Sequence, residues 1–263
     1  MRPGSTPGRT PIKFGSLVDK VLLPLLLSPF VAGLVALVAT SFAYRITAHG
    51  APGIVATGFR RSQVVSASLV ALAHGTNDAQ KTMGVITLAL VANGTLSGES
   101  PDVPTWVIVA AATAISLGTY IGGWRIIRTL GQKVTEIETP QGFSAETSSA
   151  AVILTSSHLG FALSTTQVAT GSIFGAGAGR KLASVRWGVA GQMALAWLLT
   201  LPAAAAVGAV ASWVAAGGTV GTIVVALAGV AVIAGIYLIS RRNPIGAHNV
   251  NDVPEKQPVG ASA

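Results

Sequence analysis

The sequence predicts an all-α, polytopic membrane protein in which helical spans accompany a re-entrant helical hairpin. Hydrophobic residues fill 51% of the 263 positions and charged residues only 10%, whereas a soluble domain carries about 25% charged residues. Several apolar stretches reach the roughly 20 residues that a helix needs to cross a bilayer, and the mean hydropathy is +0.63. We therefore expect a multi-pass protein of the cell (plasma) membrane.

Composition divides the chain into three parts: a polar, basic segment over residues 1–20, a transmembrane domain over 21–240 and a polar, disordered tail over 241–263. We expect helical spans at Val21–Ala43, Val64–Ala92, Thr105–Ile127, Trp187–Ala216 and Val220–Ser240. The second of these is interrupted by a polar segment at residues 73–81. The 31 glycines and many alanines suit closely packed membrane helices, in which small residues let backbones approach.

The stretch Gly142–Gly179 is different, because it is apolar overall but contains many Ser, Thr and Gly residues. It is broken near residues 160–164, and each half is too short to cross a bilayer comfortably. Two short helices that meet at a polar tip describe a re-entrant hairpin. Such a hairpin is tolerated at membrane depth only where protein or a wet cavity surrounds it.

The positive net charge of +8 is spread over short basic clusters between the apolar stretches. This placement is typical of cytoplasmic loops and offers no continuous basic face, so we expect no nucleic-acid partner. Zero cysteines exclude a disulfide scaffold, thiol catalysis and thiolate metal sites. His74 and His158 lack a third ligand at a suitable spacing, so we predict no metal site.

The basic residues also bear on orientation. Those before the hairpin (Arg125, Arg128) and after it (Arg180, Arg186) place both of its ends on the cytoplasmic side. In the amino-terminal part, the lysines before Val21 and the arginines between the first two apolar stretches both favour the cytoplasmic side of the membrane. Either the first apolar run is not a simple span, or the segment around residues 77–78 is itself a hairpin; the sequence leaves both open.

Charged residues inside the apolar stretches are the first candidates for chemistry, since each costs about 2.5–3.5 kcal/mol on insertion scales. Asp78 and Lys81 lie within the second stretch, and Glu146 lies at the start of the hairpin. We expect the helix to break at Gly75–Asp78, which would expose carbonyls and amides beside a carboxylate, as a cation or an anion site requires. The alternative is a structural charge pair, with Lys81 snorkelling or paired to Asp78.

The second candidate is the hairpin tip, Ser164-Thr165-Thr166. Ser164 can cap the following half-helix, and the free amides and positive dipole end of such a helix start form an anion site. The threonine hydroxyls add donors without adding full positive charge. The alternative is an ordinary Ser-Thr helix cap.

Four segments together resemble the PiT-type inorganic phosphate transporter family: AHGTNDAQKTMG (73–84), QGFSAETSSA (141–150), STTQVATGSIFGAG (164–177) and AWLLTLPAAA (196–205). They occur in the family's order, and the resemblance runs from about Val21 to Ser240. It implies one half, the carboxy-terminal one, of an inverted-repeat transporter. It also implies inorganic phosphate transport coupled to Na⁺ or H⁺, with no enzymatic activity and no cofactor besides the coupling ion.

The resemblance also assigns roles to residues. Phosphate binding falls to Asn77, Ser164, Thr165 and Thr166, cation coupling to Asp78, Gln141 and Glu146, and support to Lys81 and Thr82. The chain departs from the family at two positions. Gln167 stands where the family has His, which argues against a proton relay at the tip, and Ala162 replaces a Pro, which we expect to loosen the hairpin turn.

A first repeat, with its own Asn-Asp segment and Ser-Thr-Thr hairpin, does not occur ahead of Val21. We therefore expect a complementary half-transporter chain or an oligomer as partner, besides phosphate and membrane lipid. One alternative is a truncated, non-transporting membrane protein that binds or regulates a full-length relative. Another is a membrane enzyme acting on phosphorylated lipid, which lacks support because no carboxylate cluster for Mg²⁺ accompanies the tip.

Overall fold

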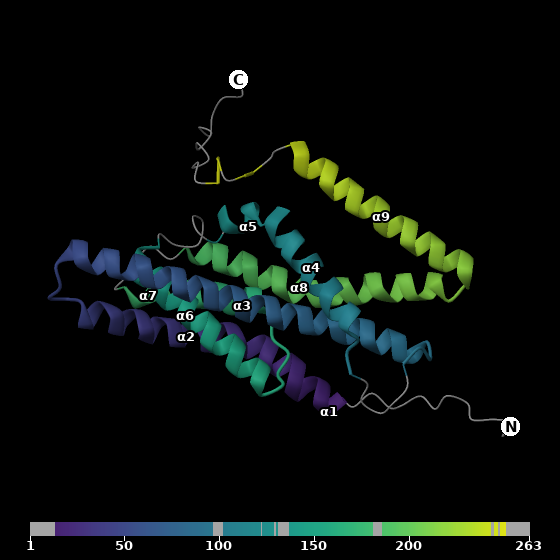
Figure 1. The fold of residues 1–263 in the computed structure, drawn as a ribbon, viewed down its shortest axis with the longest axis horizontal. Helices are drawn as coiled ribbons and strands as arrows, with labels where there is room; N and C mark the ends of the chain where they lie inside the picture. Colours follow the sequence, from purple (N-terminus) through teal and green to yellow (C-terminus); the bar gives the residue numbers. More distant parts are fainter. Residues whose placement is uncertain are drawn as a thin grey trace. The chain divides into compact units, whose positions relative to one another are not determined.

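The computed structural model describes residues 14–96, 102–121, 123–128, 130, 137–180, 186–242, 245–246 and 248–250, and the regular elements in them are helices. The chain forms two compact units. The first comprises residues 1–122 and 135–185, and the second comprises residues 123–134 and 186–263. We describe each unit by itself (Figure 1).

The first unit begins with a continuous helical run composed of α1 (Phe14–Leu17), a π-helical turn (Val18–Leu22) and α2 (Leu23–Ile46). It continues with α3 (Pro52–Ala92), α4 (Thr105–Ile121), α6 (Thr139–His158) and α7 (Thr165–Gly179). The polar segment expected over residues 1–20 is thus helical from Phe14 onward; residues 1–13 lie outside the described residues.

The expected break at Gly75–Asp78 is absent, because α3 is one unbroken α-helix of 41 residues. Two of the polar side chains find partners within the helix. The Thr76 hydroxyl donates to the carbonyls of Leu72 and Ala73, and the Asp78 carboxylate pairs with side chains one turn away. Nothing therefore requires the main chain to open. The same continuity shows that the segment around residues 77–78 is not a second hairpin.

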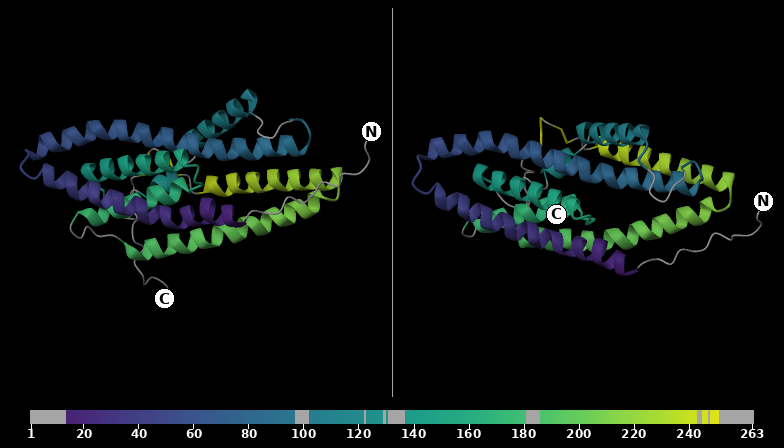
Figure 2. Two further views of the ribbon diagram at one scale, coloured as in Figure 1. Left: turned by 90° about the horizontal axis from the view of Figure 1, so that it is seen from below. Right: turned by 60° about the horizontal axis from the view of Figure 1, so that its bottom comes forward.

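The predicted helical hairpin is present as α6 and α7, which are joined by residues 159–164; its re-entrant course in the membrane stays a prediction. Gly160 has a φ of +72°, a left-handed conformation that ends α6 without strain because glycine has no Cβ. The Ser164 hydroxyl accepts a bond from the Gln167 amide at 3.4 Å, so Ser164 is the predicted N-cap. Figures 1 and 2 show the hairpin lying against both α2 and α3. The second helix, with 15 residues, is too short to cross a bilayer, and protein packs against it. The first is longer than expected, since its 20 residues match the length of a span.

Glycines bring α7 into main-chain contact with α2. A Cβ atom on Gly171 would clash with the carbonyl oxygen of Pro29, and one on Gly175 would clash with that of Gly33. One turn further on, Gly179 faces Leu37 in the same way. The two helices are therefore parallel, and only glycine fits along this line of α7.

The base of the hairpin is held by polar contacts centred on Glu138, the residue that precedes α6. Its backbone amide donates to the Gln141 side chain at 2.8 Å, in a capping box. Its carboxylate accepts from the Tyr44 hydroxyl at 2.9 Å and pairs with Arg180, which follows α7. Both ends of the hairpin are thus tied together and to the end of α2.

The second unit contains α5 (Trp124–Arg128), α8 (Trp187–Ala215) and α9 (Thr219–Arg242). The expected span Thr105–Ile127 ends earlier, at Ile121, and Gly123 with φ +93° precedes α5. A short turn with Gly218 at φ +90° joins α8 to α9, as the sequence predicted. Apart from Arg241, Arg242 and a few described positions, the tail expected to be disordered lies outside the described residues.

Three described helical runs are long and apolar enough to cross a membrane: Gly15–Ile46, Trp187–Ala215 and Thr219–Arg241. The predicted all-α, multi-pass architecture is therefore confirmed.

Candidate functional site

Polar groups from α3 and from the hairpin tip meet at Asp78. Its Oδ1 lies 3.0 Å from Lys81 Nζ, and its Oδ2 lies 3.0 Å from His74 Nε2. From α7, the Thr165 hydroxyl lies 3.4 Å from both carboxylate oxygens. We call these four residues, together with the carbonyl of Leu163, the tip cluster.

Lys81 connects the two elements, because its ammonium also donates to the Leu163 carbonyl at 2.9 Å. On the other side of the same loop, the Ala162 amide donates to the Lys20 carbonyl at 2.9 Å. A proline at position 162 could not make this bond, since it has no N–H. The expectation that Ala162 loosens the turn is therefore wrong; the alanine adds an attachment to the π-helical turn.

The tip cluster combines buried and accessible groups. Thr165 is only 3% exposed, whereas the side chains of Asp78, Lys81 and His74 are 35%, 44% and 51% exposed. The charged groups can therefore exchange partners with a ligand, while the threonine stays fixed. Thr165 is the first residue of α7, and the amides of a helix start are donors for an anion. The cluster therefore combines such donors with one carboxylate.

Asn77 lies beside the cluster but turns toward α6. Its side-chain nitrogen donates to the Ser157 hydroxyl at 2.8 Å, and the residue is 5% exposed. Within the described part of the chain, its buried amide oxygen has no hydrogen-bond partner. This oxygen is an acceptor, so it suits a cation or a protonated group better than a phosphate oxygen.

The other residues assigned to the phosphate site or its support have different environments. Ser164 acts as the helix cap, and Thr166 is exposed on the far side of the first turn from buried Thr165. Thr82 donates to the main-chain carbonyl of Asp78 on its own helix at 3.2 Å. Of the predicted residues, the structure therefore gathers Asp78, Lys81 and Thr165.

Glu146 belongs to a separate cluster. Its carboxylate accepts from the Ser66 hydroxyl at 2.6 Å and lies 3.5 Å from the Gln63 amide nitrogen. Ser66 is twelve positions before Asp78 on α3, a distance of about 18 Å along a helix. The predicted cation-coupling residues therefore do not share one site.

Gln141 is fully buried and both ends of its amide are in use. The oxygen accepts from the Glu138 amide, and the nitrogen donates to the Ala176 carbonyl at 3.3 Å. In this arrangement the side chain closes the base of the hairpin.

Sequence reasoning missed Ser66 and Gln63, and it considered His74 only as a metal ligand. A signal existed for Ser66, because Ser66, Ala73 and Asn77 are all buried and follow the i, i+7, i+11 spacing of one helix face. Because residues 73–81 were predicted to interrupt the helix, Ser66 and Asn77 were not expected on one continuous helix face.

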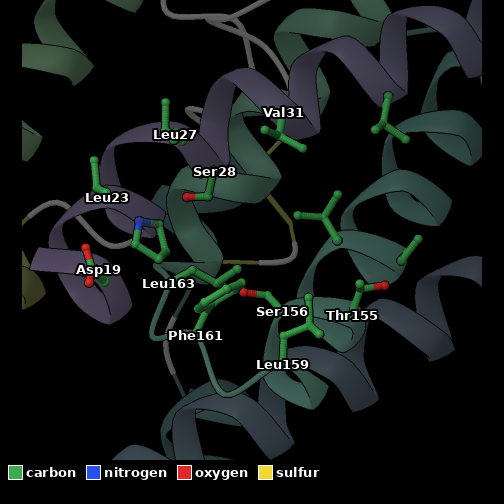
Figure 3. A pocket seen from close by; sticks show the side chains of 14 residues that line it. Asp19, Leu23, Leu27, Ser28, Val31, Thr155, Ser156, Leu159, Phe161 and Leu163 are labelled. Carbon is green, nitrogen blue, oxygen red and sulfur yellow. The ribbon is translucent and has the colours of Figure 1, made fainter. Parts of the chain in front are cut away.

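A pocket of about 520 Å³ lies between α2 and the hairpin (Figure 3). Leucine, valine and alanine side chains form most of its wall, and Asp19 lies at one end. None of the described residues that line it is basic. An apolar pocket with a carboxylate does not suit a phosphate ion, so we place the candidate anion site at the tip cluster instead.

The fold, the hydropathy and the buried hairpin define a multi-pass helical membrane protein of the transporter type. Residues 47–208 match the model of the Phosphate transporter family, and this range contains the tip cluster and the hairpin. The chain belongs to this family, which confirms the family resemblance found in the sequence.

Two relatives and one solved structure illustrate the match. A "Probable low-affinity inorganic phosphate transporter" of Mycobacterium leprae is 52% identical over 241 residues, covering 91% of this chain and 58% of that protein. One of the same name from Mycobacterium tuberculosis (strain ATCC 25618 / H37Rv) is 54% identical, covering 90% and 58%. The structure of "The sodium-dependent phosphate transporter" is similar at a TM-score of 0.52 and 24% identity, over 72% of this chain and 57% of that chain. The chain thus spans somewhat more than half the length of these proteins.

Proposed function

We propose that this chain transports inorganic phosphate across the membrane, coupled to Na⁺ or H⁺ and together with a complementary half. The observation that carries the proposal is the tip cluster, where a helical hairpin presents a buried threonine and a helix start to a charged pair on α3. The names of its relatives, which cover most of this chain, agree with phosphate as the substrate.

The cluster offers phosphate a donor that now serves Asp78. The Thr165 hydroxyl contacts this carboxylate, and a hydroxyl is a donor that phosphate oxygens accept readily. Phosphate binding exchanges one anionic partner for another, so it leaves Asp78 beside a second negative charge. A cation or a proton that neutralises the carboxylate removes this repulsion, and phosphate and cation binding become coupled.

A complementary half follows from the openness of the cluster. Inverted-repeat carriers build the substrate site from half-helix ends of both repeats. Here one hairpin tip contributes, and the charged side chains around it remain about one third to one half exposed. We propose that a second set of helix ends, from another chain or another segment, covers this side.

The test is phosphate uptake by liposomes that contain the chain, alone and with a first-repeat chain of the same family, under cation gradients. Thr165→Val keeps the volume of the side chain but removes the donor that contacts Asp78 in the tip cluster. Hydrogen bonds to a charged group contribute about 1.5–3 kcal/mol each, so the apparent phosphate affinity should fall at least about tenfold.

The matched control is Thr200→Val in α8, whose hydroxyl donates only to the Ala196 carbonyl of its own helix. Its phosphate affinity should not change. Unchanged affinity in Thr165→Val would refute the tip assignment. Correct insertion without uptake in every combination would instead support the non-transporting, partner-binding alternative.

A further inference from the structure

We infer that the Lys81 ammonium takes the position of a sodium ion at Asp78, so that phosphate binds at the tip cluster without Na⁺ at this position. The inference rests on the proposed function and specifies its ion dependence. It begins from two contacts of Lys81 Nζ, with Asp78 Oδ1 at 3.0 Å and with the Leu163 carbonyl at 2.9 Å. One acceptor lies on α3, and the other lies in the loop before α7.

These acceptors are of the types that a sodium ion requires. Carriers with interrupted helices coordinate Na⁺ through the carbonyls of unwound backbone, and Leu163 lies in the unwound loop between α6 and α7. The carboxylate of Asp78 supplies the negative charge, and the Thr165 hydroxyl lies 3.4 Å from it. An ammonium ion and a sodium ion carry the same charge, so either balances this set of oxygens.

The remaining carboxylate oxygen is also occupied. Asp78 Oδ2 lies 3.0 Å from His74 Nε2. A sodium ion that entered would have to displace the Lys81 ammonium from Asp78. The displaced ammonium would stay nearby on the same helix, and its positive charge would repel the ion. The described residues thus already provide a donor to each oxygen of Asp78.

Lys81 has an advantage over a sodium ion for the position at Asp78, because it is covalently attached to the same helix. Lys81 is three residues after Asp78 on the continuous helix α3, so the two side chains lie on the same face. A tethered group acts at an effective concentration in the millimolar range or above, and it does not leave when the ion concentration falls. The bridge from α3 to the hairpin tip therefore does not depend on ion binding in this chain, whereas a bridge made by sodium would.

A different role for Lys81 is a direct bond to phosphate. The two roles differ in what happens when the ammonium is removed. A vacated sodium-like position makes phosphate binding depend on Na⁺, whereas a lost phosphate ligand weakens binding equally with and without Na⁺.

The experiment measures binding of ²²Na⁺ and of ³²P-phosphate to the purified full chain in nanodiscs, together with the complementary half where phosphate binding requires it. Sodium is compared with N-methyl-D-glucamine at constant ionic strength. For the unmodified chain we expect phosphate binding to agree within about twofold in the two media, and no bound Na⁺ that Asp78→Asn removes.

For Lys81→Met we expect Na⁺ to bind and phosphate affinity to depend on Na⁺ by about tenfold or more, with both effects absent in the Lys81→Met/Asp78→Asn double variant. Lys81→Arg keeps the positive charge and should remain independent of Na⁺. The matched control Arg61→Met removes an exposed positive charge elsewhere on α3 and should behave as the unmodified chain.

Two results would overturn the inference. One is phosphate binding by the unmodified chain that falls tenfold without Na⁺. The other is Lys81→Met that binds phosphate equally weakly in both media and takes up no Na⁺. The first needs no variant, so it decides even if Lys81→Met fails to fold. Failure of the proposed function looks different, since phosphate then does not bind under any condition while the Na⁺ measurements still report on Lys81.

Discussion

The tip and the body of the hairpin are held in place by different kinds of contact. At the tip, the contacts join charged or polar side chains, three of them about one third to one half exposed. Along the body of the hairpin, α7 contacts α2 through main-chain atoms at Gly171 and Gly175, where no side chain fits. Side-chain contacts at 3.0–3.4 Å can be exchanged for a ligand, whereas close-packed backbone cannot move apart without losing dispersion contacts. Binding therefore belongs to the tip and rigidity to the body.

The largest expected effect is loss of coupled uptake in Asp78→Asn. The amide keeps the size of the side chain but loses the charge that balances a cation, and it breaks the ion pair with Lys81. Insertion should be unaffected, because the change removes a charge from an apolar region. Phosphate uptake and membrane-inserted protein are measured together, with Asp102→Asn, outside the helices, as the control. Normal uptake at limiting cation would remove Asp78 from the coupling mechanism.

The next largest effect is a loss of stability in Gly175→Ala. The new methyl group would fall on the Gly33 carbonyl, and overpacking of this kind costs about 1–3 kcal/mol. In the control Gly58→Ala, no atom lies within 4 Å of the new Cβ. This variant should gain up to about 1 kcal/mol of stability, since Ala has a higher helix propensity than Gly. Thermal unfolding in detergent measures both. Equal stability of the two variants would contradict the close packing of α2 and α7.

A smaller effect is expected in Ser66→Ala, which removes the 2.6 Å bond to Glu146. A hydrogen bond to a charged group contributes about 1.5 kcal/mol or somewhat more. Ser68→Ala is the control, because the Ser68 hydroxyl donates to its own helix on the exposed face. A comparison of unfolding temperatures tests whether α3 and α6 are joined here; no difference between the two variants would show that they are not.

The smallest effect is expected at the base of the hairpin, in Tyr44→Phe. The lost bond to Glu138 is solvent-exposed, and Glu138 keeps its ion pair with Arg180. Exposed polar contacts of this kind contribute about 1 kcal/mol or less. Protease resistance of the hairpin, measured with and without high salt, should change little. A large loss would mean that the base, rather than the glycine packing, fixes the hairpin.

The sequence predicted the hairpin well because its signals are local. A run rich in Ser, Thr and Gly, a break near residues 160–164 and a capping serine each depend on neighbouring residues. The break predicted in α3 failed for a related reason. Gly75, Thr76 and Asp78 favour an interruption individually, but their side chains find partners within one helical turn.

The long-range contacts could not be predicted from one sequence. The bond from Lys81 to the Leu163 carbonyl joins residues 82 positions apart, and the bond from Ala162 reaches back to Lys20, near the start of the described chain. For the same reason, the sequence grouped Glu146 with Asp78. The two helices α3 and α6 run parallel, so Glu146 contacts Ser66 and, further along both helices, Ser157 contacts Asn77. This parallel course places Glu146 away from Asp78.

The glycine spacing on α7 has a consequence for motion. Gly171, Gly175 and Gly179 face successive turns of α2. If α7 turned and advanced along α2 by one residue, the side chains of Ser172 and Ala176, which follow two of these glycines, would move to the positions where a Cβ meets a carbonyl oxygen. A screw motion of this kind is therefore blocked, so we expect α2 and α7 to move together. Movement within this unit is then expected on the α3 side, where side chains rather than backbone form the contacts.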